Sequence, residues 1–140
     1  MRIFFDTNVL VSALVARGLC AELYEAVVLD HQLIIGEPVV AELLRILQDK
    51  LHVPPAKVAK VRSELQRFEQ APASDAAKVS FKRDPTDEPI LSCAVAAKAD
   101  VFVTGDKAIL ALGGIGGVPV CSPRELWFKL ATPENQESSD

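Results

Sequence analysis

Short apolar runs typical of strands alternate with longer segments of helical spacing along most of the chain. In the longer segments, apolar residues recur three or four positions apart, as they do on one face of a helix. Strands that alternate with helices predict an α/β domain, with a mainly parallel sheet and helices on both faces. The predicted strands are Arg2–Phe5, Leu33–Ile35, Lys78–Phe81, Val101–Thr104 and Val118–Cys121.

The segments of helical spacing lie between these strands, and a polar stretch ends the sequence. At 140 residues the chain has the length of one domain. We expect this domain to cover residues 1–130 and the polar tail, residues 131–140, to be disordered. The predicted helices cover Val9–Leu29, in two parts broken near Arg17 and Gly18, then Glu37–Leu51, Pro55–Gln70, a segment beginning at Asp87, a short segment after Asp106, and Arg124–Leu130.

The net charge of −4 argues against a simple basic nucleic-acid-binding domain. The charge is nevertheless unevenly distributed. Residues 45–83 hold nine basic and four acidic side chains, a net of +5, which leaves −9 for the rest. A basic segment beside an acidic site could follow a nucleic-acid backbone, although it could equally be a solvated helix face. The basic residues are Arg45, Lys50, Lys57, Lys60, Arg62, Arg67, Lys78, Lys82 and Arg83.

Cysteine and histidine usage argues against zinc and against a disulfide framework. The three cysteines are widely spaced and form no CxxC pair, and His31 and His52 stand apart from them. Free cysteines fit a reducing compartment. The N-terminal stretch is interrupted by Asp6 and Asn8, unlike a secretory signal, and no apolar run approaches the roughly 18 residues of a membrane helix. We therefore expect a cytoplasmic protein.

Acidic residues fall where a parallel sheet would bring them together. Asp6 follows the first predicted strand, Asp106 follows the strand that ends at Thr104, and Asp87 opens a helix. Ligands of open parallel sheets lie at the carboxyl ends of the strands. Glu42 lies inside a predicted helix, at the margin of its apolar face, where it can reach a neighbouring cleft.

Each acid also has a purely structural interpretation. Asp87 and Asp106 are suited to capping the helices that follow them, Asp6 to an Asx-turn, and Glu42 to a solvated rim. Four carboxylates at one sheet edge would repel one another unless a cation neutralised them. All-oxygen ligands favour Mg²⁺ or Mn²⁺, and such ions suit phosphoryl chemistry.

Four segments together resemble a PIN-domain nuclease, most closely the VapC-like toxins of bacterial and archaeal toxin–antitoxin systems. They are IFFDTNVLVSAL, EPVVAELLRIL, RDPTDEPILSCAVAAKADVFVTGDKAIL and VPVCSPREL. The resemblance covers about residues 1–130. It implies a parallel sheet of about five strands between helices and an acidic pocket that binds Mg²⁺ or Mn²⁺ and hydrolyses RNA. It also implies a homodimer and a cognate antitoxin that blocks the cleft.

Carried over by motif, the resemblance assigns a role to each of several residues. Asp6, Glu42, Asp87 and Asp106 match the catalytic, metal-binding acids. Thr7, Asn8 and Thr104 are expected to orient the carboxylates through hydrogen bonds. Close to Asp87, Arg83 is the best single candidate for a phosphate contact, with Lys82 beside it.

Three alternatives remain at this stage. The first is a PIN-fold binding or regulatory module that acts through protein association without catalysis. The second is a haloacid-dehalogenase-type phosphatase, whose DxDx[TV] signature requires an acid where Asn8 stands. The third is a nucleotide-binding Rossmann domain, but the glycines at 113–117 neither form GxGxxG nor follow the first strand, so a flexible turn suits them better.

Overall fold

The computed structural model describes residues 1–74 and 87–131, which form an α/β fold around a mostly parallel sheet. Within these residues the sheet has six strands in the order β3-β2-β1-β4-β6-β5. All neighbouring pairs are parallel except β5 and β6, which form an antiparallel hairpin at one edge. The strands are β1 (Arg2–Phe5), β2 (Gln32–Gly36), β3 (Glu69–Ala71), β4 (Val101–Val103), β5 (Gly114–Ile115) and β6 (Val118–Cys121).

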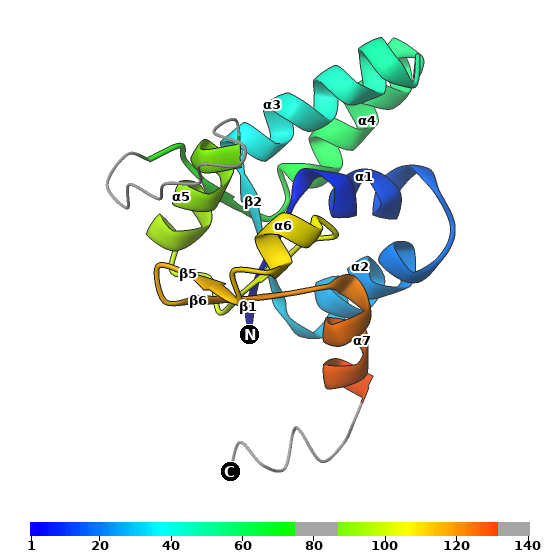
Figure 1. The fold of residues 1–140 in the computed structure, drawn as a ribbon. Coiled ribbons are helices and arrows are strands. Elements are labelled where there is room, and N and C mark those ends of the chain that lie inside the picture. Colours follow the sequence, from blue (N-terminus) through cyan, green and yellow to red (C-terminus); the bar gives the residue numbers. More distant parts are fainter. Residues whose placement is uncertain (75–86, 132–140) are drawn as a thin grey trace.

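Helices flank the sheet on both sides. Figure 1 shows α5 on one side and α2 with α7 on the other, whereas α3 and α4 extend away together above the sheet. No helix in the described part of the chain is long and apolar enough to span a membrane. The helices are α1 (Thr7–Val15), α2 (Leu19–Asp30), α3 (Glu37–Arg45) with its π-helical continuation η1 (Ile46–Lys50), α4 (Pro55–Leu65), α5 (Glu88–Ala96), α6 (Lys107–Leu110) and α7 (Pro123–Ala131).

The central strand β1 is buried because helices cover both faces of the sheet. Phe4 is fully buried and stacks on Phe102 of β4, with ring centroids 5.6 Å apart. Gly36 at the end of β2 is needed for this packing, because a Cβ there would come 2.6 Å from the Phe4 ring and 3.1 Å from Cys93 Sγ. The apolar runs predicted at Arg2–Phe5, Leu33–Ile35 and Val101–Thr104 therefore lie in the core.

The predicted helix Pro55–Gln70 is wrong in its last turn. Helix α4 ends at Leu65, and Glu69 begins strand β3 at the other edge of the sheet. The Gln70 side chain donates hydrogen bonds to the carbonyls of Leu65 and Phe68, at 2.8 and 2.9 Å, which satisfies backbone groups freed where the helix ends. The short polar strand pairs with β2 in parallel, so neighbouring backbone rather than side-chain pattern defines it.

The glycine cluster at 113–117, expected to form a turn, lies in a β-hairpin. Ile115 pairs with Val118, which leaves Gly116 and Gly117 as the two turn residues. Their φ angles are 50° and 86°, and two consecutive positive φ values are what a type I′ hairpin turn requires. The predicted strand Lys78–Phe81 and the predicted tail beyond Ala131 lie outside the described residues. The domain boundary at residue 130 stays a prediction.

Candidate functional site

The carboxyl ends of β1 and β4 bring the first and last predicted acids into one region. Asp6 directly follows β1 and caps α1, and its backbone N–H donates to the Val103 carbonyl at 2.9 Å. Asp106 follows β4 and caps α6. Figure 1 shows α1, α3 and α6, which carry or follow the acids, around the upper end of the central strands.

Asp6 is an almost completely buried carboxylate. Its side chain is held at both oxygens, because the Thr104 hydroxyl donates to Oδ2 at 2.7 Å and the Thr7 N–H donates to Oδ1 at 2.8 Å. Burial raises the pKa of Asp6, and the negative charges of Glu42 and Asp106 raise it further, against the lowering effect of the two hydrogen bonds. The protein thus keeps an acid here without a compensating cation among the described residues.

Thr104 links the two acids at the ends of β1 and β4. Besides donating to Asp6, its fully buried hydroxyl accepts a hydrogen bond from the Asp106 N–H at 3.0 Å. Asp106 Oδ1 in turn accepts from Ala108 N at 2.8 Å and from Ile109 N at 3.3 Å. Asp106 Oδ2 has no hydrogen-bond partner in the described part of the structure, so this oxygen is free to bind a ligand.

Glu42 reaches the same region from the middle of α3. It lies on the helix between the buried residues Val39 and Leu43 and is itself half-buried. Its charge raises the pKa of Asp6, so the two carboxylates interact electrostatically. No described residue pairs with its carboxylate, which agrees with the sequence interpretation of a side chain at the edge of the core.

The remaining predicted site residues differ in burial and in their contacts with Asp6. Asp87 is half-buried at the N-cap position of α5, where its side chain makes no capping hydrogen bond. Thr7 is buried, but its hydroxyl has no hydrogen-bond partner among the described residues. Asn8 is exposed. The predicted RNA-binding residues Lys82 and Arg83 lie outside the described residues.

The donor chemistry of the site fits a magnesium-type ion. The described part of the structure contains no preformed group of three or more His, Cys, Asp or Glu residues that could hold a metal. Mg²⁺, however, keeps several of its waters and is commonly bound through one or two carboxylates. A buried acid that interacts with two further carboxylates supplies hard oxygen donors and a negative field that a cation would offset. The residues therefore fit such an ion.

The three cysteines and two histidines are the other candidates for nucleophilic or zinc chemistry. Burial raises the pKa of the Cys93 and Cys121 thiols to about 11, so both are protonated near neutral pH. All three cysteines are free. His31 ends α2, where burial and the N-terminal ammonium lower its pKa, and His52 lies in the turn before α4. These positions give no support to a nucleophilic cysteine or a zinc site among the described residues.

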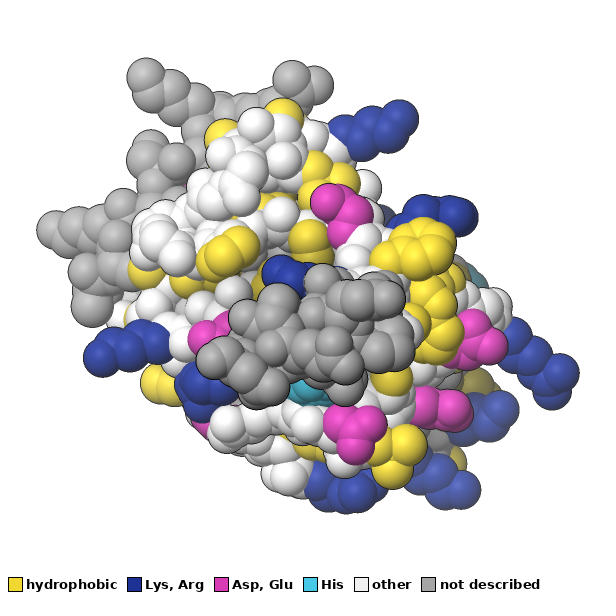
Figure 2. Space-filling model, turned by 90° about the horizontal axis from the view of Figure 1, so that it is seen from below, with side chains coloured by type: hydrophobic (Ala, Val, Ile, Leu, Met, Phe, Trp, Pro, Cys, Tyr) yellow, Lys and Arg dark blue, Asp and Glu magenta, His cyan; other side chains and the backbone are white. Residues whose placement is uncertain are grey.

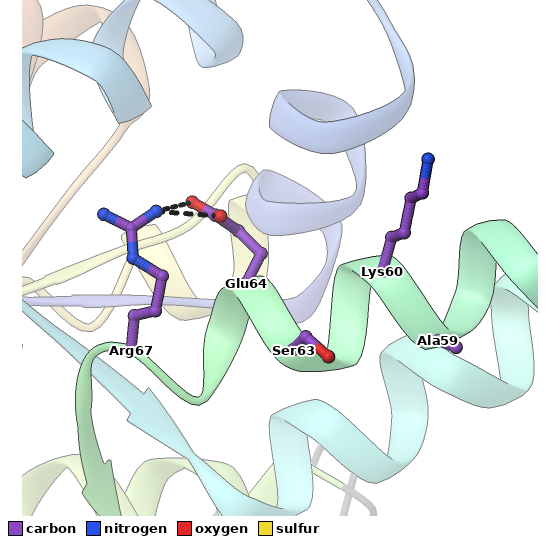
Figure 3. A pocket seen from close by; sticks show the side chains of 5 residues that line it. All are labelled: Ala59, Lys60, Ser63, Glu64 and Arg67. Atoms are coloured by element: carbon purple, nitrogen blue, oxygen red, sulfur yellow. Dashed lines mark hydrogen bonds and ion pairs between the residues drawn. The ribbon is translucent and has the colours of Figure 1, made fainter.

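The described part of the predicted basic segment is exposed along η1 and α4. Figure 2, a view from below, shows Lys and Arg side chains mainly around the outline of the molecule, intermixed with acids. A shallow pocket of about 460 Å³ lies along α4, and Arg67 on its lining pairs with Glu64 at 2.9 Å. Figure 3 shows the lining side chains, with Lys60 extending away from the helix. Arg67 is thus already engaged, whereas Lys60 is presented to solvent. The exposed basic residues of this segment are Arg45, Lys50, Lys57, Lys60, Arg62 and Arg67.

A parallel α/β sheet with carboxylates at its strand ends defines the class of protein. The PIN domain family matches residues 2–108, and the chain belongs to that family. Among solved structures it is similar to a chain of "Crystal structure of VapBC2 from Rickettsia felis bound to a DNA fragment from their promoter", with a TM-score of 0.65 and 20% identity over 87% of this chain and 98% of that chain. At this identity the likeness shows a shared fold. No curated protein matches the sequence.

Proposed function

We propose that the chain is a Mg²⁺- or Mn²⁺-dependent endoribonuclease that acts as the toxin of a toxin–antitoxin system. One observation carries the proposal: in a PIN-domain fold, the buried Asp6 carboxylate interacts with Glu42 and Asp106 at the carboxyl ends of the strands. Uncompensated acids at this edge are costly to the folded protein. Such a cost is understandable where the acids bind a cation needed for phosphodiester hydrolysis.

The proposed mechanism assigns a task to each side chain. Asp6, Glu42, Asp87 and Asp106 would hold the cation, which when bound lowers the pKa of a coordinated water and offsets charge on the phosphate. Thr104 keeps the Asp6 carboxylate fixed through its 2.7 Å hydrogen bond. The hydrogen bonds from the Ala108 and Ile109 N–H groups to Oδ1 fix Asp106 and leave its Oδ2 available. Attack of water on the phosphorus would leave a 5′-phosphate and a 3′-hydroxyl.

The basic segment supplies the proposed RNA contact. Exposed cations on η1 and α4, Lys60 among them, could bind successive phosphates of a single strand. Lys82 and Arg83 precede Asp87 in the sequence and remain our candidates for contacts nearest the scissile phosphate. If Arg83→Ala left the salt dependence of RNA affinity unchanged, this part of the proposal would be wrong.

We further propose a cognate antitoxin and a homodimeric toxin. Support comes from the fold that this chain shares with a chain of the VapBC2 structure. Co-expression with the product of a small adjacent gene, followed by size-exclusion chromatography with light scattering, tests both ideas. A monomer that never co-purifies with such a product would contradict them.

The activity test uses single-stranded RNA with Mg²⁺, Mn²⁺ or EDTA. We expect cleavage in either metal and none in EDTA, with 5′-phosphate ends detected by ligation. Unchanged cleavage by a folded Asp6→Asn variant would refute the site assignment. The absence of cleavage by a protein that still binds Mn²⁺ would favour the alternative, a PIN-fold module that acts through protein association.

A further inference from the structure

A buried hydroxyl beside Asp6 has no hydrogen-bond partner among the residues that the structure describes. Thr7 is the first residue of α1 and only 1% exposed. Its backbone N–H donates to Asp6 Oδ1 at 2.8 Å, but Oγ1 is buried without a hydrogen-bond partner among the described residues. The orphaned atom therefore belongs to the same residue whose amide already touches the carboxylate.

An orphaned hydroxyl is unusual because buried polar groups are nearly always bonded. Leaving one unpaired costs about 1–3 kcal/mol, and each such group requires an explanation. The other buried threonine at this edge, Thr104, makes two hydrogen bonds. Valine has nearly the same shape as threonine and would fill the position of Thr7 without this cost, so packing alone does not account for the hydroxyl.

We propose that the Thr7 hydroxyl is a positioning group that gains its hydrogen bond when a hydrated divalent cation binds at Asp6. The inference rests on the cation of the proposed function. A water of the ion's hydration shell offers both a donor and an acceptor to a hydroxyl, and Mg²⁺ retains such waters in protein sites. Thr7 would thus hold Asp6 with its amide and the hydrated ion with its side chain.

The test compares Thr7→Val, which removes the hydroxyl and keeps the shape, with Thr7→Ser, which keeps the hydroxyl. Mn²⁺ affinity is measured by isothermal titration calorimetry, and Tm is measured in EDTA. We expect Thr7→Val to bind Mn²⁺ about tenfold more weakly, as is typical for the loss of a hydrogen-bonding partner around a metal site, and Thr7→Ser to bind nearly as the wild type does. In EDTA, the Tm of Thr7→Val should equal or exceed that of the wild type.

Two results with the Thr7 variants would overturn the inference. One is equal Mn²⁺ affinity of Thr7→Val and the wild type. The other is a Tm of Thr7→Val in EDTA clearly below that of both the wild type and Thr7→Ser, since the hydroxyl would then already be paired in the free protein. A wild type that binds Mn²⁺ but cuts no RNA refutes the proposed nuclease and leaves this inference standing. A wild type that binds no Mn²⁺ refutes both.

Discussion

Charged side chains are paired at one end of the parallel strands and left without an ion pair at the other. At the end where the strands begin, the Arg2 guanidinium donates two hydrogen bonds to Glu69, at 2.7 and 2.8 Å, and others to the carbonyls of Ala97 and Lys98. The Arg2 backbone N–H donates to Asp100 Oδ2 at 2.6 Å. Hydrogen bonding to Glu69 raises the pKa of Arg2, and the same bond lowers the pKa of Glu69. Both groups are thus stabilised in their charged forms.

At the end where the strands finish, Asp6, Glu42 and Asp106 form no ion pair with a Lys or Arg among the described residues. Burial raises the pKa of Asp6, the charges of Glu42 and Asp106 raise it further, and the Thr7 hydroxyl has no hydrogen-bond partner in the described part of the chain. Figure 2 views the molecule from below, the side of Figure 1 on which β1 begins, and shows acidic and basic side chains intermixed on that face. One end of the sheet therefore stabilises the fold, whereas the other carries a cost in stability that binding of a cation would relieve.

The largest effect is expected from Asp6→Asn. RNA cleavage should fall by about 10²-fold or more, because losing a direct ligand costs at least as much as losing a supporting partner. In EDTA the free energy of unfolding should stay the same or rise, because the change removes a buried charge that Glu42 and Asp106 disfavour. Gel assays and urea denaturation measure the two quantities. Asp30→Asn, at an exposed acid at the end of α2 and outside the basic segment, is the matched control and should change neither.

Thr104→Val should produce the next largest effect. It removes the hydrogen bonds to Asp6 and from the Asp106 N–H, so we expect Mn²⁺ affinity to fall about 10- to 100-fold. Unlike Thr7→Val, it should also destabilise the protein in EDTA, by about 1–3 kcal/mol, because a backbone N–H loses its partner. Calorimetry and urea denaturation provide the measurements. Wild-type affinity and stability in Thr104→Val would show that the hydroxyl does not hold the two acids.

Arg2→Ala changes the end of the sheet where the strands begin and should affect stability alone. Removing the paired hydrogen bonds to Glu69 should lower the free energy of unfolding by about 1–2 kcal/mol, since charge-assisted pairs in this half-exposed setting are worth little more. Arg2→Lys should lower the free energy of unfolding by a smaller amount. RNA cleavage per folded molecule should be unchanged when it is measured below the unfolding transitions of the wild type and the variant. A selective loss of cleavage would mean that the two ends of the sheet are coupled.

The smallest effect concerns the pH dependence of the same pair. The pKa of Glu69 is lowered from its ordinary value of 4.5 by Arg2, so its contribution is present above pH 4.5 and is lost as pH falls through the lowered value. The stability difference between the wild type and Glu69→Gln should therefore shrink on acidification. Urea denaturation at pH values on either side of 4.5 measures it. A difference that grew as pH fell would contradict the assignment.

Prediction from sequence succeeded where local pattern decides structure. The apolar run before Asp6 formed the buried central strand, and the α/β class with a mainly parallel sheet is confirmed. It failed at the edge strands. Residues Glu69–Ala71 are polar and short, and Gly114 has no side chain to pack, so neither strand β3 nor β5 carries a period-two pattern. Pairing with a neighbouring strand defines them, and the linear sequence does not show that neighbour.

The site residues also depend partly on local pattern and partly on contacts between distant segments. Local pattern correctly predicts Asp6 and Asp106 after strands and Glu42 on a helix, because backbone periodicity and capping chemistry are local. Which of these groups are buried and which are paired depends on the assembled sheet. The hydroxyl that holds Asp6 lies 98 residues away in the chain, at Thr104. Burial and hydrogen bonding between distant segments depend on how the whole sheet assembles, and they determine where charge is stabilised and where it is left for a ligand.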